Sequence, residues 1–170
     1  ETDHLFFRLD LLQNDLETHA ASRKSTWKPN VRAMTQNWLN MGLRPRAVTR
    51  DIEWGVKIPL DDEVWGEKRV YVWFDAVQGY LTCARIWSER IAEESGSESD
   101  IWRRWWMDSG NLRHIYFMGK DNIPFHTIIW PGILMALNRG REDSERLHLE
   151  DNVASNCLLY TSDAADDIRC

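Results

Sequence analysis

The sequence predicts an α/β fold built on part of a doubly wound parallel sheet, with helices on both faces. Two short apolar runs, Arg69–Phe74 and His114–Met118, predict strands, and helical patterns follow each of them. The order strand, helix, helix, strand, helix is that of a βαβα unit, and near-continuous apolar strands are typical of a sheet covered on both faces. Because such a unit leaves sheet edges uncovered, we expect the 170 residues to form an incomplete sheet, a piece of a longer protein.

Two helices are expected before the first strand. Asp10 is predicted to cap a short helix that carries Leu12 and Leu16. A second helix is expected to begin at Pro29 and to end at Gly42, because Pro suits a first turn and Gly a helix end. Its apolar side chains follow a helical period: Val31, Met34, Trp38 and Leu39. Residues 44–59 are expected to be extended chain and loop.

Three helices are expected after the first predicted strand, Arg69–Phe74. The first carries Tyr80, Ala84, Trp87 and Ile91 on one face and ends in the polar turn SGSES. A short helix carries Trp102, Trp105 and Trp106 as packing residues, and a longer helix runs from 123 to 137 with Pro124 in its first turn. Since ligands bind outside the carboxyl ends of strands in such sheets, the pattern predicts a site at 73–80 and 119–126.

Composition excludes several classes of protein. The chain is 43% apolar and 28% charged, which indicates a globular protein rather than a disordered one. No stretch approaches the roughly 20 apolar residues of a membrane span, and no signal peptide is recognisable, so we expect no membrane partner. The three cysteines have no metal-type or disulfide-framework spacing, which favours a reducing compartment and hence the cytoplasm.

Charge is distributed unevenly along the chain. The net charge of −6 argues against a dedicated nucleic-acid binder. Residues 23–50 nevertheless hold seven basic residues and no acidic one. This segment is either a solvated helix face or a surface that meets phosphates.

Residues 119–130 carry the first candidate site. Gly119 allows close backbone approach after the strand, and the following helix start favours an anion or a ribose hydroxyl. Asp121 can accept hydrogen bonds there, while His126 and Trp130 are four apart on one helix face. The alternative is a capped helix with His126 satisfied inside the core.

Residues 73–80 carry the second candidate site. Trp73, Ala76 and Tyr80 form one wall of an apolar pocket or are ordinary core residues. Arg50 can bind a carboxylate or phosphate, or is a surface arginine. No P-loop, G-x-G-x-x-G, H-E-x-x-H or G-x-S-x-G motif occurs, so hydrolase and dehydrogenase readings have no motif support.

Together these segments resemble the methionyl-tRNA synthetases, a family of class I aminoacyl-tRNA synthetases. The resemblance rests on five strings in the family's order: ETDHLFFRL, NWLNMGLRPRAVTRDIEWGVKIP, KRVYVWFDAVQGYL, YFMGKDNIPFHTIIWPGIL and DNVASN. It implies that residues 1–156 are the C-terminal half of the Rossmann-like catalytic nucleotide-binding domain. Val77 and Gln78 depart from the residues that the family often carries.

The resemblance also implies roles for individual residues. Arg50 and Asp121 would be catalytic, with Gly119 and Asp121 against the adenosine ribose. The methionine side chain would be bound by Trp73, Ala76, Val77, Tyr80, Asn122, His126 and Trp130. The implied reaction is activation of L-methionine by Mg²⁺-ATP to methionyl-adenylate, followed by transfer to tRNA(Met).

Some family features are not in this sequence. The H-I-G-H-type and K-M-S-K-S-type motifs, which contact ATP, are absent, as is the connective region that holds zinc; no metal site is expected in this chain. We therefore expect the 170 residues alone to be inactive. Residues 157–170, CLLYTSDAADDIRC, look like translated sequencing adapter, with a divergent acidic tail as the alternative. A non-catalytic binding module and a synthetase for another apolar amino acid are the competing interpretations of the whole chain.

Overall fold

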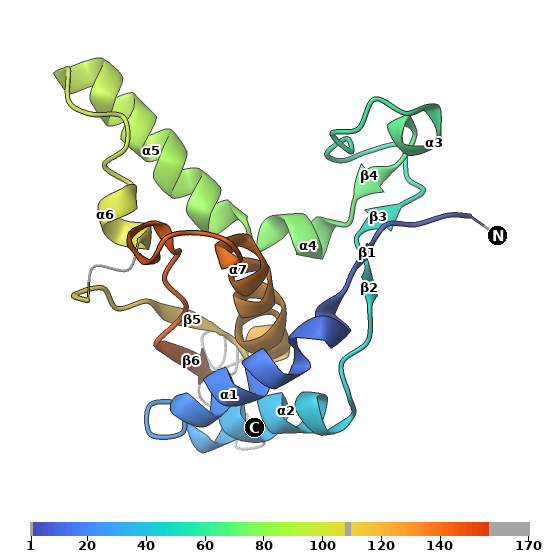
Figure 1. Cartoon of the computed structure of the whole chain (residues 1–170), viewed down its shortest axis with the longest axis vertical. Helices are drawn as coiled ribbons and strands as arrows, with labels where there is room; N and C mark the ends of the chain where they lie inside the picture. The colour runs from blue at the N-terminus through green and yellow to red at the C-terminus, as the bar shows by residue number, and fades with distance from the viewer. Residues whose placement is uncertain (1, 108–109, 157–170) are drawn as a thin grey trace, which may run out of the picture. The chain divides into compact units, whose positions relative to one another are not determined.

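The computed structural model describes residues 2–107 and 110–156 (Figure 1). The chain divides into two compact units. Unit 1 consists of Glu1–Leu11 and Arg44–Trp106, and unit 2 of Leu12–Leu43 with the chain from Met107 onward. Each unit is described by itself.

Unit 1 holds two small antiparallel sheets and a series of helices. β1 (Phe6–Phe7) pairs with β2 (Arg46–Ala47), and β3 (Thr49–Arg50) pairs with β4 (Arg69–Val70). The helices are α3 (Glu63–Gly66), α4 (Val72–Ala76), α5 (Gly79–Ser95) and α6 (Arg103–Trp106), and the 3₁₀ helix η1 (Leu9–Leu12) leads out of the unit. As predicted, α5 ends at the polar turn, where Gly96 adopts a left-handed φ of 66°.

The predicted strand Arg69–Phe74 is wrong beyond Val70. Its partner β3 is only two residues long, so the rest of the run has no strand to pair with. The chain instead closes a helical turn, in which the N–H groups of Phe74 and Asp75 donate to the Tyr71 carbonyl at 2.9 and 3.0 Å. The tertiary surroundings thus override the β propensity of the run.

Unit 2 combines a helical hairpin with a parallel strand pair. α1 (Gln13–Ser22) and α2 (Pro29–Asn40) form the hairpin, and β5 (Ile115–Gly119) pairs with β6 (Asn152–Asn156) in the register Ile115↔Asn152. Between the strands lie η2 (Lys120–Asn122), the π turn η3 (Phe125–Ile129), α7 (Trp130–Asn138) and η4 (Asp143–Glu145). The core joins these parts through Trp27, Val31, Ile123 and Val153. The second predicted helix, with Pro29 at its start, and the helix from 123 are confirmed.

Two further predictions are corrected. The α/β class is confirmed, but the βαβα pairing is wrong, because β5 pairs with β6 and not with β4. The sequence did not predict the strand β6, because its residues NVASN are largely polar. In the structure Val153 and Ser155 of this strand are buried. Asp10 does not cap α1; it lies within η1 and pairs with Arg8, and no side chain caps α1.

No helix among the described residues has both the length and the apolar character needed to cross a membrane. The predicted tail, residues 157–170, lies outside the described residues.

Candidate functional site

The carboxyl end of β5 leads directly into the first candidate segment. Gly119 is buried and extended, with φ −70° and ψ 154°, and η2 follows at once. Asp121 is exposed and Asn122 is half-buried. Pro124 has a φ of −62°, which suits the first turn of the helix that continues into α7. This segment therefore places one exposed carboxylate at the strand end, where parallel sheets bind ligands.

His126 and Trp130 lie farther along the same helix and are buried, with exposed fractions of 6% and 1%. The Nδ1 atom of His126 is 2.9 Å from the carbonyl oxygen of Asn122. Because a carbonyl only accepts, Nδ1 carries the proton. Burial lowers the pKa of His126, and the Asn122 carbonyl offsets this only in part. The imidazole is therefore neutral near pH 7. The geometry of His126 matches the alternative interpretation of a buried histidine with a hydrogen-bond partner in the core.

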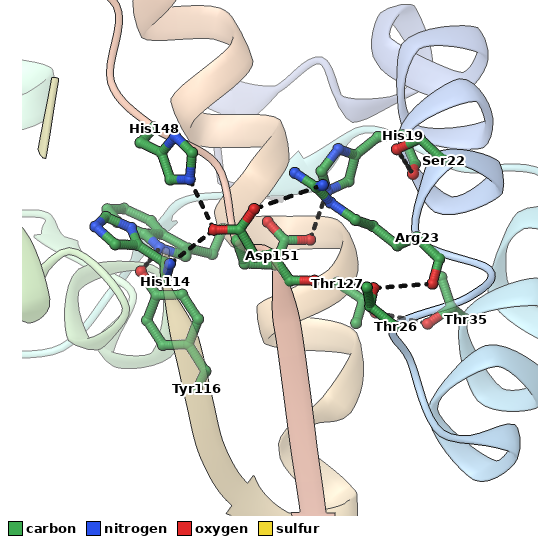
Figure 2. A network of polar contacts seen from close by, with 12 residues as sticks. His19, Ser22, Arg23, Thr26, Thr35, His114, Tyr116, Thr127, His148 and Asp151 are labelled. Atoms are coloured by element: carbon green, nitrogen blue, oxygen red, sulfur yellow. Dashed lines mark hydrogen bonds and ion pairs between the residues drawn. The ribbon is translucent and has the colours of Figure 1, made fainter. Parts of the chain in front are cut away.

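A network of buried polar contacts joins the hairpin of unit 2 to its strand pair (Figure 2). His19 of α1 lies 2.7 Å from Glu150, whose side chain is fully buried. Asp151 accepts from the backbone N–H of His114 and contacts His148, both at 2.8 Å. Burial alone would raise the pKa of Asp151, but these two hydrogen bonds, together with the charges of His148 and Arg23, outweigh it and lower the pKa. The network fixes the chain immediately before β6.

The second candidate segment belongs to unit 1. Trp73, Ala76, Val77 and Tyr80 follow one another at helical spacing across α4 and the start of α5. Val77 is 4% exposed, whereas Trp73 is 47% and Tyr80 43% exposed. Partial burial raises the pKa of the Tyr80 hydroxyl. The expectation that Trp73 and Tyr80 are ordinary core residues does not fit this exposure.

Arg50, also in unit 1, is half-buried and held by its own strand. Its guanidinium donates to the carbonyl oxygens of Ala47 and Thr49 at 3.1 and 2.7 Å and lies 4.0 Å from the centre of the Tyr71 ring. Two strong contacts and a cation–π contact orient the group. It is therefore not a freely mobile surface arginine.

Beside Arg50 lies a polar cluster that the sequence did not reveal. The buried Lys68 pairs with Asp51, and Thr2 donates to the same carboxylate at 2.8 Å. The pKa of Asp51 is lowered, chiefly by the hydrogen bond from Lys68 and next by that from Thr2. Asp51 directly follows β3 and Lys68 directly precedes β4, 17 positions apart, so no local pattern signals their contact.

The expected site residues thus fall into two groups. Unit 2 brings together Gly119, Asp121, Asn122, His126 and Trp130, and unit 1 contains Arg50, Trp73, Ala76, Val77 and Tyr80. Within the described parts of the chain, no cluster of three or more His, Cys, Asp or Glu side chains could hold a metal ion.

Sequence comparison finds one matching family. Residues 1–164 match the family described as tRNA synthetases class I (M). The methionine–tRNA ligase of Thermoplasma acidophilum is 52% identical over 135 residues, which is 79% of this chain and 23% of that protein. The methionine–tRNA ligase of Roseiflexus castenholzii is 48% identical over 179 positions, covering 98% of this chain and 29% of that protein. The chain therefore spans about a quarter of the length of these relatives.

Solved structures agree with the sequence comparison. Methionyl-tRNA synthetase of Mycobacterium tuberculosis, in a crystal structure bound by methionyl-adenylate, has a TM-score of 0.63 and 27% identity. That similarity covers 88% of this chain and 25% of the other. The fold of this chain is therefore similar to part of the fold of that enzyme.

Proposed function

The chain belongs to the family tRNA synthetases class I (M), and we propose that it carries the methionine-binding part of a methionine–tRNA ligase. The observation that carries the proposal is the placement of His126 and Trp130 directly after the carboxyl end of β5, together with 52% identity to a methionine–tRNA ligase. The substrates are L-methionine, ATP with Mg²⁺, and tRNA(Met).

The proposed reaction has two steps. The methionine carboxylate attacks the α-phosphorus of ATP, forming methionyl-adenylate and releasing pyrophosphate. A ribose hydroxyl at the 3′ end of the tRNA then attacks the carbonyl carbon of methionyl-adenylate, and AMP leaves. No enzyme nucleophile is needed, so catalysis consists of positioning and charge stabilisation.

Named side chains have distinct roles in this proposal. The fixed guanidinium of Arg50 binds the carboxylate or the reacting phosphate, and the exposed Asp121 accepts hydrogen bonds from the ribose beside Gly119. The residues that we propose for recognition of the methionine side chain are Trp73, Ala76, Val77 and Tyr80, which belong to unit 1, and Asn122, His126 and Trp130, which belong to unit 2.

Thioether chemistry supports a pocket of this composition. One methylene in an apolar pocket discriminates by only about 1–3 kcal/mol, so shape alone separates similar amino acids poorly. Sulfur–aromatic contacts add a preference for methionine. The neutral His126 suits such a pocket, because it adds no buried charge.

Location and metal content follow from the same proposal. A tRNA-charging enzyme acts where its tRNA is, so we place this protein in the cytoplasm. We place zinc, if the longer protein holds it, in the connective region outside this chain.

The test uses a chimaera, because the chain matches only a quarter of its relatives. Residues of this chain replace the matched 135-residue segment of the Thermoplasma acidophilum ligase. We expect methionine-dependent ATP–pyrophosphate exchange from the chimaera and none from the isolated 170-residue chain. Trp73→Ala should abolish methionine binding, whereas Trp87→Ala, another exposed tryptophan of unit 1, should not.

Each other outcome has a definite meaning. Unchanged methionine affinity in Trp73→Ala contradicts the pocket assignment. Methionine binding without any exchange in the chimaera favours the non-catalytic binding module. Exchange with leucine or isoleucine but not methionine favours a synthetase for another apolar amino acid.

A further inference from the structure

Tyr116 contacts two of the proposed pocket residues at once. It lies in β5 with an exposed fraction of 8%. Its hydroxyl oxygen accepts the indole N–H of Trp130 at 3.0 Å. Its ring lies 5.5 Å from the His126 ring, centre to centre, at an interplanar angle of 50°.

The helix between these two pocket residues is not regular. Phe125–Ile129 form a π turn, which includes His126 and ends just before Trp130. The i→i+5 bonds of a π turn are rare inside helices, and such turns are frequent at functional sites. The orientation of His126 within the turn and of Trp130 just after it therefore depends on what they pack against, and both contact Tyr116.

We propose that Tyr116 is a positioning residue of the methionine pocket, which fixes the indole of Trp130 through its hydroxyl and the imidazole of His126 through its ring. The inference rests on the proposed function. The hydroxyl orients Trp130 because an indole N–H at 1% exposure has a strong preference for the one geometry that satisfies it. The ring restricts His126 because offset and tilted aromatic pairs have preferred geometries.

The experiment uses the chimaera and Tyr116→Phe, which removes a single oxygen and keeps the ring. We expect the KM for methionine to rise about tenfold, because the orientation of Trp130 is lost, with kcat and the KM for ATP nearly unchanged. Tyr116→Leu, which also removes the ring against His126, should raise the KM further.

Thr127→Val is the matched control. Thr127 lies on the same helical turn, is equally buried, and accepts a hydrogen bond from the Thr35 hydroxyl at 2.9 Å. The Thr127 hydroxyl also donates to the Ile123 carbonyl at 3.0 Å. Thr127→Val therefore removes two buried hydrogen bonds, neither of which involves a pocket residue. We expect Thr127→Val to lower thermal stability while leaving the KM for methionine unchanged.

The hydrogen bond can also be tested from its donor, in a double-variant cycle with Trp130→Phe. Trp130→Phe removes the donor of the same hydrogen bond, so adding Tyr116→Phe to it should raise the methionine KM little further. An unchanged KM in Tyr116→Phe, or an equal rise in Thr127→Val, overturns the positioning role. Absence of methionine-dependent exchange in the unmutated chimaera overturns the proposed function instead.

Discussion

The side chains of the two candidate segments differ in how deeply they are buried. In unit 2, His126 and Trp130 are almost fully buried, and each has a hydrogen-bond partner within the unit. In unit 1, Trp73 in the short helix α4 and Tyr80 at the start of α5 are nearly half exposed. Residues with the same proposed role thus contribute very differently to the folded structure.

Because of this difference, the effect of a substitution on methionine binding can be separated from its effect on stability. A side chain that is part of the core cannot be removed without loss of stability, whereas an exposed one can. Substitutions of Trp73 and Tyr80 should therefore report on methionine binding alone. Substitutions of the buried His126 and Trp130 report on both binding and stability, so a stability measurement must accompany every binding measurement at these two positions.

The largest expected effect comes from comparing two tryptophans. Trp130→Ala should lower the free energy of unfolding by about 3–5 kcal/mol, because it leaves a large cavity in the core of unit 2. Trp73→Ala should change it by no more than about 0.5 kcal/mol, because Trp73 is largely exposed. Urea unfolding of the chain, followed by circular dichroism, measures both. Equal losses in the two variants contradict the comparison.

A smaller loss of stability is expected when the contact between His19 of α1 and Glu150 is removed. His19→Leu removes the partner of Glu150, whose side chain is 0% exposed and whose second oxygen has no partner among the described residues. An unpaired buried acceptor costs about 1–3 kcal/mol, so we expect a loss of that size in the free energy of unfolding.

The control for this variant is Asp15→Ala, an exposed position on the same helix. It should change the free energy of unfolding by less than about 0.5 kcal/mol. If His19→Leu changes the free energy of unfolding as little as Asp15→Ala does, the contact with Glu150 contributes nothing measurable to the attachment of α1.

The sequence predicted the elements with strong local signals. The helix that begins at Pro29 and the strand before Gly119 are both found, because proline, glycine and helical periodicity act locally. The sequence did not predict where β4 ends, because the end of β4 depends on the length of its partner strand β3, which lies earlier in the chain. The resemblance to the family implies the candidate site residues, which stay a prediction, but the contacts of Tyr116 and Lys68 depend on segments that are distant in sequence.

The smallest effect is a pH dependence specific to His126. Burial lowers the pKa of His126 in the folded protein, while the unfolded chain keeps the ordinary value of about 6.5. Below that value the unfolded state binds more protons, so the contribution of His126 to stability is complete above about pH 6.5 and is lost as the pH falls. Asp151, whose pKa is also lowered, keeps its full contribution to stability above about pH 4 and loses it only below that pH, so it does not interfere.

The measurement compares the chain with its His126→Gln variant. The free energy of unfolding of the original chain should fall by up to about 1.4 kcal/mol per pH unit between about pH 6.5 and 5 relative to the variant. The other histidines are common to both proteins and cancel in the difference. Parallel pH profiles would mean that His126 is hydrated in the folded state. Residues 119–130 would then resemble the exposed segment 73–80, and the contrast between the two segments would disappear.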